Sequence, residues 1–325
     1  MKYLKTKTPF TPYYTTKNGE AFLCDTLEFL PSIQDESVDL ILTSPPFALK
    51  RKKEYGNEDE DKYCDWFMTF APHLKRILKE NGSFVLDLGG AYKPGFPVRS
   101  IYQFELLVRL VKDAGFFLAQ EFYHYNPARL PAPAEWVNVR RVRVKDSVNV
   151  VWWLSKTPNP KADNRKVLRA YSDSMKSLLK NGYRAKLRPS GHDISEKFSR
   201  DNGGAIPPNL LQLANTDSNG SYQKLCRANG IKVHPARFPP QFAEFFVKFL
   251  TDESAVVYDP FGGSNTTGYV AEALGRRWVI SELNEEYLRG SKFRFEQAPP
   301  QKLPTKKKPK ISRKTEEGDL FASIK

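Results

Sequence analysis

Short apolar runs alternate along this chain with segments that have the spacing of amphipathic helices, and this alternation limits the folds available to it. Helical spacing extends over residues 61–82, 101–115 and 266–274, and Gly82 and Gly115 are expected to end the first two helices. The strand-like runs lie at 21–26, 38–44, 83–90, 116–126, 147–157, 256–261 and 278–283. Nearly continuous apolar strands alternating with helices are typical of a mostly parallel sheet covered on both faces by helices. The sequence therefore predicts an α/β fold of this kind.

Residues 158–233 interrupt the alternation, because they are polar and rich in Gly, Asn, Ser and Lys. Their scattered apolar side chains, among them Tyr171, Leu178 and Leu211, are sufficient for a modest core. We therefore expect a small ordered insert, with a disordered linker as the alternative. Residues 297–325 are rich in Lys and Pro, and we expect them to form a disordered basic tail.

The charge balance points to a polyanionic partner. The chain has 51 Lys and Arg residues against 37 Asp and Glu residues, a net charge of +14. Such an excess is typical of proteins that bind nucleic acid. One basic cluster comprises Lys50, Arg51, Lys52 and Lys53, and a second comprises Arg140, Arg141 and Arg143. The second cluster alternates as a strand does. Both clusters are expected to face the nucleic acid, and a solvated surface is the alternative for each.

Apolar runs and cysteines exclude other classes of protein. No run reaches the eighteen apolar residues that span a membrane, and the N-terminal residues lack the apolar stretch of a signal peptide. We therefore expect a cytoplasmic protein that does not contact a membrane. Cys24, Cys64 and Cys226 lie far apart and form no CxxC pair, so neither a metal site nor a disulfide framework is expected.

A glycine-rich turn near the C-terminus indicates a cofactor site. The strand-like run at 256–261 leads into Asp259-Pro260-Phe261-Gly262-Gly263, and Glu282 ends the following run. Consecutive glycines let the backbone turn tightly and approach a ligand, and an acid one strand later suits ribose hydroxyl groups. The segment matches neither a P-loop nor G-x-G-x-x-G. It therefore favours a nucleoside cofactor over a dinucleotide, with a purely structural turn as the alternative.

A second motif, Ser44-Pro45-Pro46-Phe47, directly follows the run at 38–44. Taken alone, a Pro-Pro pair of this kind often only ends a strand. Together with the glycine turn it resembles the amino-methylating DNA methyltransferases, which use S-adenosylmethionine and carry [D/N/S]-P-P-[aromatic]. In that family Ser at the first position is typical of cytosine-N4 enzymes, and Asp of adenine-N6 enzymes. The resemblance extends over about 14–295 and includes "VLDLGGAY", "GHDI", "DNGGAIPPNLLQ" and "HPARFP".

The order of the motifs, with SPPF first and the cofactor turn last, resembles the circularly permuted β arrangement of this family. The resemblance implies a Rossmann-like methyltransferase fold, with a mixed sheet and helices on both faces. It divides the chain into a catalytic half at 14–157, a target-recognition insert at 158–233, a cofactor-binding half at 234–296 and the basic tail at 297–325.

The implied reaction transfers a methyl group to an exocyclic cytosine amine in double-stranded DNA. This amine is a poor nucleophile, because its lone pair is delocalised into the ring. The Ser44 hydroxyl and the Pro45 carbonyl can accept its two N–H groups, and Phe47 offers a face on which the base can stack. Pro45 and Pro46 fix these groups in place. Asp87 is the candidate proton acceptor through Ser44, with a structural hydrogen-bond acceptor as the alternative.

The same resemblance implies further residues that bind the cofactor, while charge and side-chain chemistry suggest those that bind the DNA. Those for the cofactor are Asp25, His234, Pro235, Arg237, Asp259, Phe261, Gly262, Gly263, Ser264 and Glu282. The alternatives are a helix cap for Asp25 and a core histidine for His234. Those for the DNA are the two basic clusters named above together with Arg188, His192 and Arg200 in the insert. A base inside a duplex cannot reach such a pocket, so it has to be flipped out, and Tyr125 is a candidate wall for the extruded ring.

Two alternatives remain open. An adenine-N6 enzyme is the nearer one, disfavoured by Ser44 in place of an acid, and a non-catalytic DNA-binding protein on the same fold is the other. A C5-cytosine enzyme would need a Cys after a Pro, and a zinc deaminase would need its H-x-E and P-C-x-x-C signature; neither occurs. The resemblance also suggests a restriction-modification system with a separately acting endonuclease as partner.

Overall fold

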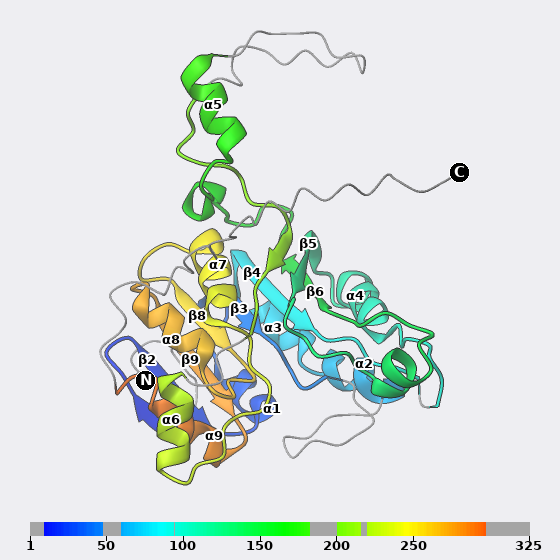
Figure 1. The fold of residues 1–325 in the computed structure, drawn as a ribbon. Helices are drawn as coiled ribbons and strands as arrows, with labels where there is room; N and C mark the ends of the chain where they lie inside the picture. Colours follow the sequence, from blue (N-terminus) through cyan, green and yellow to red (C-terminus); the bar gives the residue numbers. More distant parts are fainter. Residues whose placement is uncertain (1–9, 48–59, 94, 183–199, 216–219, 297–325) are drawn as a thin grey trace.

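The computed structural model describes residues 10–47, 60–93, 95–182, 200–215 and 220–296. In this part of the chain, one nine-stranded sheet has the order β1-β2-β9-β8-β3-β4-β6-β5-β7 (Figure 1). The strands are β1 Tyr14–Thr15, β2 Gly19–Leu23, β3 Val38–Thr43, β4 Leu78–Leu88, β5 Phe117–Tyr125, β6 Val148–Ser155, β7 Leu210–Gln212, β8 Val256–Asp259 and β9 Arg277–Glu282.

The middle of the sheet is parallel. β2, β9, β8, β3 and β4 run in the same direction, each hydrogen-bonded to the next. β6 is antiparallel to both β4 and β5, β7 is parallel to β5, and β1 is antiparallel to β2. The sheet is therefore mixed, as expected. The carboxyl ends of its five central strands meet at one edge, which is where ligands bind in open α/β sheets.

Helices cover both faces of the sheet (Figure 1). One face packs against α1 Thr26–Phe29, α2 Glu60–Met68, α3 Ala71–Ile77 and α4 Tyr102–Lys112, and the other against α7 Pro240–Leu250, α8 Thr266–Ala273 and α9 Glu285–Lys292. The alternation of strand side chains creates the two cores, because Ile41 of β3 belongs to the first and its neighbours Leu40 and Leu42 to the second. The expected α/β fold with helices on both faces is confirmed. Within the described residues no helix has the length and apolar character needed to cross a membrane.

The helix predicted over 61–82 is wrong in its extent. The chain forms α2 and α3 as separate helices and enters β4 at Leu78, so Gly82 lies inside a strand. Pro72 is the reason for the break, because it stands in the first turn of α3, where a missing N–H group is tolerated. The apolar pattern continues from the end of α3 into the start of β4, because both are buried. It therefore did not show where the helix ends.

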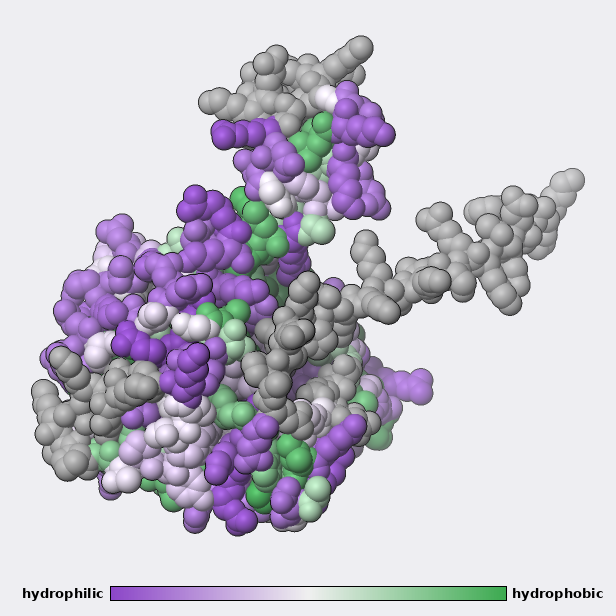
Figure 2. All heavy atoms as spheres, turned by 90° about the vertical axis from the view of Figure 1, so that its left-hand side faces the viewer, coloured by the Kyte–Doolittle hydropathy of each residue, from purple (hydrophilic) through white to green (hydrophobic). Residues whose placement is uncertain are grey.

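The residues expected to form a core in the 158–233 insert do not form one in its described part. The buried cluster within these bounds is a different one, Tyr222, Cys226 and Ile231. α5 Asp173–Asn181 has no buried residue, and Ile206 is 68% exposed. Leu211 is buried, but in β7 as part of the main sheet. Figure 1 shows α5 projecting from the body, and Figure 2 shows hydrophilic side chains over much of this projection. α6 Ser221–Ala228 also belongs to the body, where it packs near α9. The domain boundaries stay a prediction.

The strand predicted for the second basic cluster is also wrong. A single π-helical turn, η2 Glu135–Val139, precedes it, and the residues that follow are in neither a helix nor a strand. Arg143 is a structural residue, because its guanidinium donates to the Pro97 carbonyl over 2.7 Å and lies 4.9 Å above the Tyr92 ring. Arg140 and Arg141 are exposed. Local alternation therefore did not reveal these contacts between distant segments.

Candidate active site

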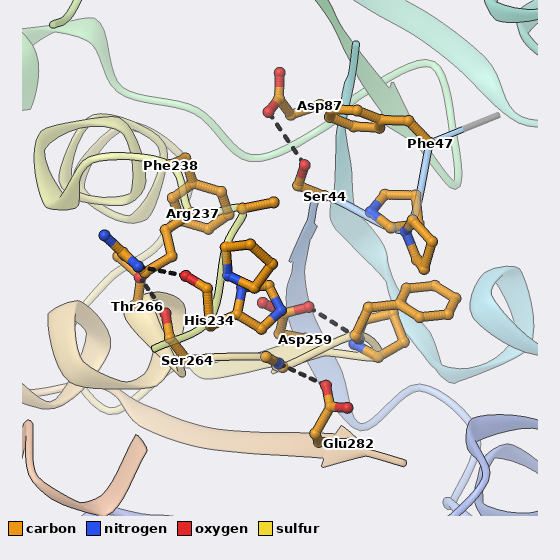
Figure 3. Close-up of a pocket in the computed structure, with 18 of the residues that line it drawn as sticks. Ser44, Phe47, Asp87, His234, Arg237, Phe238, Asp259, Ser264, Thr266 and Glu282 are labelled. Carbon is orange, nitrogen blue, oxygen red and sulfur yellow. Dashed lines mark hydrogen bonds between the residues drawn. The ribbon is translucent and has the colours of Figure 1, made fainter. Parts of the chain in front are cut away.

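Five acidic or hydroxyl side chains meet at the carboxyl edge of the parallel strands. Asp25 follows β2, Ser44 follows β3, Asp87 lies near the end of β4, Asp259 ends β8 and Glu282 ends β9. They line a cavity of about 760 Å³. Figure 3 shows Ser44 and Asp87 toward one end of this cavity and Glu282 toward the other.

Every residue predicted for catalysis or for the cofactor lines this one cavity. The lining also includes residues that the sequence analysis missed, among them Trp66, Phe70, His124, Asn126, Arg129, Asn149, Asn215 and Phe238. Tyr125, the candidate wall for an extruded base, is not among them, whereas its neighbours His124 and Asn126 are. Side chains alternate between the two faces of the sheet along β5, so Tyr125 points away from the face that His124 and Asn126 share. The sequence alone does not show which of these faces borders the cavity.

The glycine turn has a backbone that side chains would disturb. Gly263 has a φ of +49°, in the left-handed region that favours glycine. A Cβ atom on Gly262 would lie 2.7 Å from Ile280 Cδ1, so this position has room only for glycine. The Gly262 N–H donates to the Ser281 carbonyl over 2.9 Å. The turn therefore brings bare backbone to the cavity wall.

Asp259 stabilises this turn from inside. Its Oδ1 atom accepts from the Thr43 hydroxyl over 2.7 Å and from the Phe261 N–H over 3.1 Å, and its Oδ2 atom accepts from the Thr267 hydroxyl over 2.7 Å. The side chain is buried, and burial raises the pKa of Asp259 to about 6. Both oxygens thus have protein partners, which gives this residue a structural role next to the predicted cofactor site.

Glu282 is held in place by two backbone groups. Its Oε2 atom accepts from the Gly263 N–H over 2.7 Å, and its Oε1 atom accepts from the Asn284 N–H over 2.8 Å. Burial raises the pKa of this carboxyl group above its usual range. Each oxygen keeps a second lone pair for a ligand hydroxyl. Asp25 lines the cavity too, but its Oδ1 atom caps α1 by accepting from the Leu27 N–H over 2.7 Å.

An aromatic wall stands beside the turn. The Phe261 ring lies 5.7 Å from the ring of Trp66 and 5.3 Å from that of Phe70. All three residues line the cavity. Flat apolar surface next to a fixed carboxylate is the combination that a nucleoside requires, with stacking for the base and hydrogen bonds for the sugar.

The His234–Arg237 segment is tied to the glycine turn by α6 and the end of α9. The His234 N–H donates to the Tyr222 hydroxyl over 3.3 Å, and the Arg237 guanidinium donates to the His234 carbonyl. The Arg294 guanidinium lies 4.3 Å above the Tyr222 ring, and its Nε atom donates to the Ser264 carbonyl over 2.6 Å. Tyr222 and Arg294 therefore link the two segments that border this side of the cavity.

The SPPF motif forms the opposite side. The Ser44 hydroxyl donates to Asp87 Oδ2 over 3.2 Å. The Phe47 ring lies against the backbone of Gly89, where an added Cβ would come within 2.4 Å of the ring. Burial raises the pKa of Asp87, and this effect is opposed by His124 and by hydrogen bonds from Asn149 and Ser44.

Among the described residues, the predicted DNA contacts Arg140, Arg141 and Arg143 do not line this cavity. Lys50, Arg51, Lys52, Lys53, Arg188 and His192 lie outside the described residues. Arg200 is exposed and does not line the cavity. Among the described residues, no three His, Cys, Asp or Glu side chains are close enough to hold a metal ion.

The sheet, the glycine turn and the SPPF edge match proteins that methylate DNA. Residues 38–293 match the family model described as DNA methylase. This match covers most of the chain, so the chain belongs to the DNA methylase family.

Particular relatives agree with this assignment. The chain is 56% identical to the Type II methyltransferase M.PvuII of Proteus hauseri, over 87% of this chain and 85% of that protein. It is 27% identical to M.ScaI of Streptomyces caespitosus, over 85% of this chain and 81% of the relative. The solved PvuII DNA methyltransferase (cytosine-N4-specific) matches with a TM-score of 0.73 and 48% identity, covering 88% of this chain and 90% of that one. An M1.HpyAVI-SAM complex matches at a TM-score of 0.51 and 16% identity, over 86% of this chain and 100% of that one, which shows the shared fold.

Proposed function

We propose that this chain transfers the methyl group of S-adenosylmethionine to the exocyclic N4 amine of a cytosine flipped out of double-stranded DNA. The observation that carries this proposal is that Ser44, with its hydroxyl bonded to Asp87, shares one cavity with the glycine turn and Glu282. The acceptor for the amine and the residues that would bind the cofactor therefore lie in the same cavity. The solved PvuII DNA methyltransferase is cytosine-N4-specific, and this supports the choice of base.

The residues at the lower end of the cavity in Figure 3 fit S-adenosylmethionine. Glu282 would accept from the ribose hydroxyls, Phe261 would stack near the adenine, and the backbone at Gly262 permits close approach. When bound, this cofactor supplies a methyl group activated by a sulfonium centre. The chain's own contribution is to fix the position of the cofactor relative to the amine.

At the other end, Ser44 and the Pro45 carbonyl would hold the amine by its two N–H groups while Phe47 stacks on the base. The amine gains a methyl group and loses one proton. The Ser44 oxygen accepts that proton as the Ser44 hydroxyl proton passes to Asp87, which releases it to solvent after the reaction. Charge and atoms balance without a metal or a further base.

The substrate would be duplex DNA, bound in the cytoplasm by the basic surface. Such an enzyme marks the sites of a separately acting restriction endonuclease and so protects host DNA. The circularly permuted order of the motifs and a target-recognition role for the projecting segment around α5 belong to the same proposal. The segment is exposed and carries basic residues such as Lys176 and Lys180, which suits contact with DNA.

One experiment tests the assignment. Plasmid DNA is incubated with the chain and S-adenosylmethionine, digested to nucleosides, and the methylated species identified by mass spectrometry. We expect N4-methyldeoxycytidine. N6-methyldeoxyadenosine as the main product would establish the adenine alternative. For the non-catalytic alternative, calorimetry with S-adenosylmethionine would give no heat of binding.

A further inference from the structure

A line of hydrogen bonds extends behind Ser44 through residues that belong to neither motif. The Arg129 Nη1 atom donates to Asn149 Oδ1 over 3.0 Å. The Asn149 Nδ2 atom donates to Asp87 Oδ1 over 3.2 Å and to Oδ2 over 3.4 Å. Ser44 donates to the same carboxyl group. All four residues line the cavity.

The sheet register places Asn149 beside Asp87. Asp87 of β4 pairs with Val151 of β6, and Asn149 precedes Val151 by two residues on the same strand. Side chains alternate along a strand with a period of two, so Asn149 and Asp87 stand on the same face as diagonal neighbours. On its other side Asn149 pairs with His124 of β5.

Arg129 determines which way the Asn149 amide faces. A guanidinium group only donates hydrogen bonds, so the amide oxygen of Asn149 must face Arg129 and its NH₂ group must face Asp87. Asp87 therefore meets donors from both Asn149 and Ser44. Ser44 has one hydroxyl proton, and its donation to Asp87 leaves the Oγ lone pairs available to the cavity.

We propose that Asn149 and Arg129 are positioning residues for methyl transfer: they hold Asp87 in its charged form, which keeps the Ser44 hydroxyl oriented as an acceptor of the target amine. This inference rests on the proposed function, because it requires an exocyclic amine beside Ser44. A protonated Asp87 would instead donate to Ser44. The Ser44 proton would then turn toward the amine, which is itself a donor, and the amine would lose its acceptor.

The electrostatics of the described residues agree with this geometry. Burial favours the protonated form of Asp87, whereas His124 on β5, the Asn149 amide, the Ser44 hydroxyl and Arg129 beyond β5 lower its pKa. The His124 Nε2 atom lies 3.3 Å from the Leu213 carbonyl, which holds the ring in place beside β6. Removing Asn149 or Arg129 thus raises the pKa of Asp87 further.

The test is the pH dependence of kcat at saturating DNA and S-adenosylmethionine. In Asn149→Ala and Arg129→Met, we expect the acid limb to move upward by about one to two pH units, the scale of a hydrogen bond to a charged group. Above the limb, kcat should return toward the wild-type value. Arg129→Lys keeps the charge, so its acid limb should lie close to the wild-type position. Arg277→Met is the matched control, because Arg277 lies at the opposite edge of the sheet and bonds to the Ser254 carbonyl.

A second readout needs neither cofactor nor DNA. Protein labelled with ¹³C at aspartate carboxyl carbons is titrated by NMR, and Asp87→Asn assigns the resonance. The Asp87 titration should move upward in the same two variants. An Asp87 resonance that stays in place, or a kcat lowered equally at every pH, would overturn the inference. So would an acid limb that disappears in His124→Gln, because His124 would then be the titrating group.

Failure of the proposed function is seen separately. The nucleoside product is analysed in the same reactions, and a wild-type product other than N4-methyldeoxycytidine changes the identity of the amine. The shift of the acid limb still decides whether Asn149 and Arg129 act on Asp87, whichever exocyclic amine is methylated.

Discussion

The Ser44 hydroxyl donates to Asp87 Oδ2 over 3.2 Å although the two residues lie 43 positions apart in the sequence. They meet because β3 and β4 are adjacent and parallel, with Thr43 paired to Leu86. Each residue directly follows a paired residue, so the backbone ladder sets the distance between them. Under the proposed function, this pair acts in the chemical step and the glycine turn acts in cofactor binding, so the two can be altered separately.

Ser44→Ala should lower kcat by about 10²–10⁴-fold, the range for a positioned acid–base group, because the amine loses its acceptor. The affinity for S-adenosylmethionine should stay unchanged, since the glycine turn is untouched. Single-turnover kinetics and calorimetry measure the two effects. Ser37→Ala is the control, because Ser37 bonds to the Gln34 carbonyl before β3 begins. Loss of cofactor binding with an unchanged rate would contradict the placement of the two sites.

Glu282→Ala should weaken the binding of S-adenosylmethionine by about 1.5–3 kcal/mol, because a charged acceptor for the ribose is removed. This corresponds to an increase in Kd of about 10- to 150-fold. Calorimetry measures it, with the exposed Glu253→Gln as the control. An unchanged Kd would mean that this acid does not contact the cofactor.

Asp259 should make the stability of the fold depend on pH. Burial raises its pKa from 3.8 to about 6, so the folded state binds more protons than the unfolded state between these values. Stability therefore falls as the pH rises through this window, by up to about 3 kcal/mol. Asp259→Asn lacks this contribution. The free energy of unfolding of the variant should therefore rise relative to that of the wild-type chain between about pH 4 and pH 7. Urea denaturation at both pH values measures this, with the exposed Asp173→Asn as the control. A difference that does not change with pH would disprove it.

Arg141 and Arg143 should behave differently although both were predicted to bind DNA. Arg141 is exposed, so Arg141→Ala should reduce the log–log salt slope of duplex binding by about 0.9, the loss of one phosphate contact. Arg143 bonds to Pro97 and lies over Tyr92, so Arg143→Ala should lower the thermal stability and leave the slope unchanged. Salt titrations and thermal melts of both variants test the distinction. A reduced slope for Arg143→Ala would mean that Arg143 contacts DNA after all.

The sequence was sufficient to predict the α/β class and the cavity residues carried by the two motifs. Both motifs follow buried strands directly, and the carboxyl ends of parallel strands share one edge, so local patterns fixed their location. His124 and Asn149 were missed, because their contribution depends on the register of β5 and β6, which leaves no mark on the local sequence. The role of Arg143 was missed for the same reason, since its partners lie about fifty residues away.

The end of α3 was misplaced because both elements at that junction are buried, and an apolar pattern does not distinguish a buried helix from a buried strand. Likewise, the apolar residues of the 158–233 segment were read as a core of their own. Leu211 instead completes the edge of the main sheet through β7. Composition gives the number of apolar side chains but not the surface on which they are buried.

The ladder between β3 and β8 joins the part of the chain that carries Ser44 to the part that carries the glycine turn. Leu40 pairs with Val257 and Ile41 with Tyr258, and the Thr43 hydroxyl bonds to Asp259 across the same seam. Under the proposed function, the distance between the target amine and the cofactor methyl group is therefore set by the backbone pairing of β3 and β8. The side chains that bind the reactants do not set it. A fold of this kind can exchange its acceptor at the strand end, and so adapt to a different exocyclic amine in the course of evolution, while the length of the transfer stays the same.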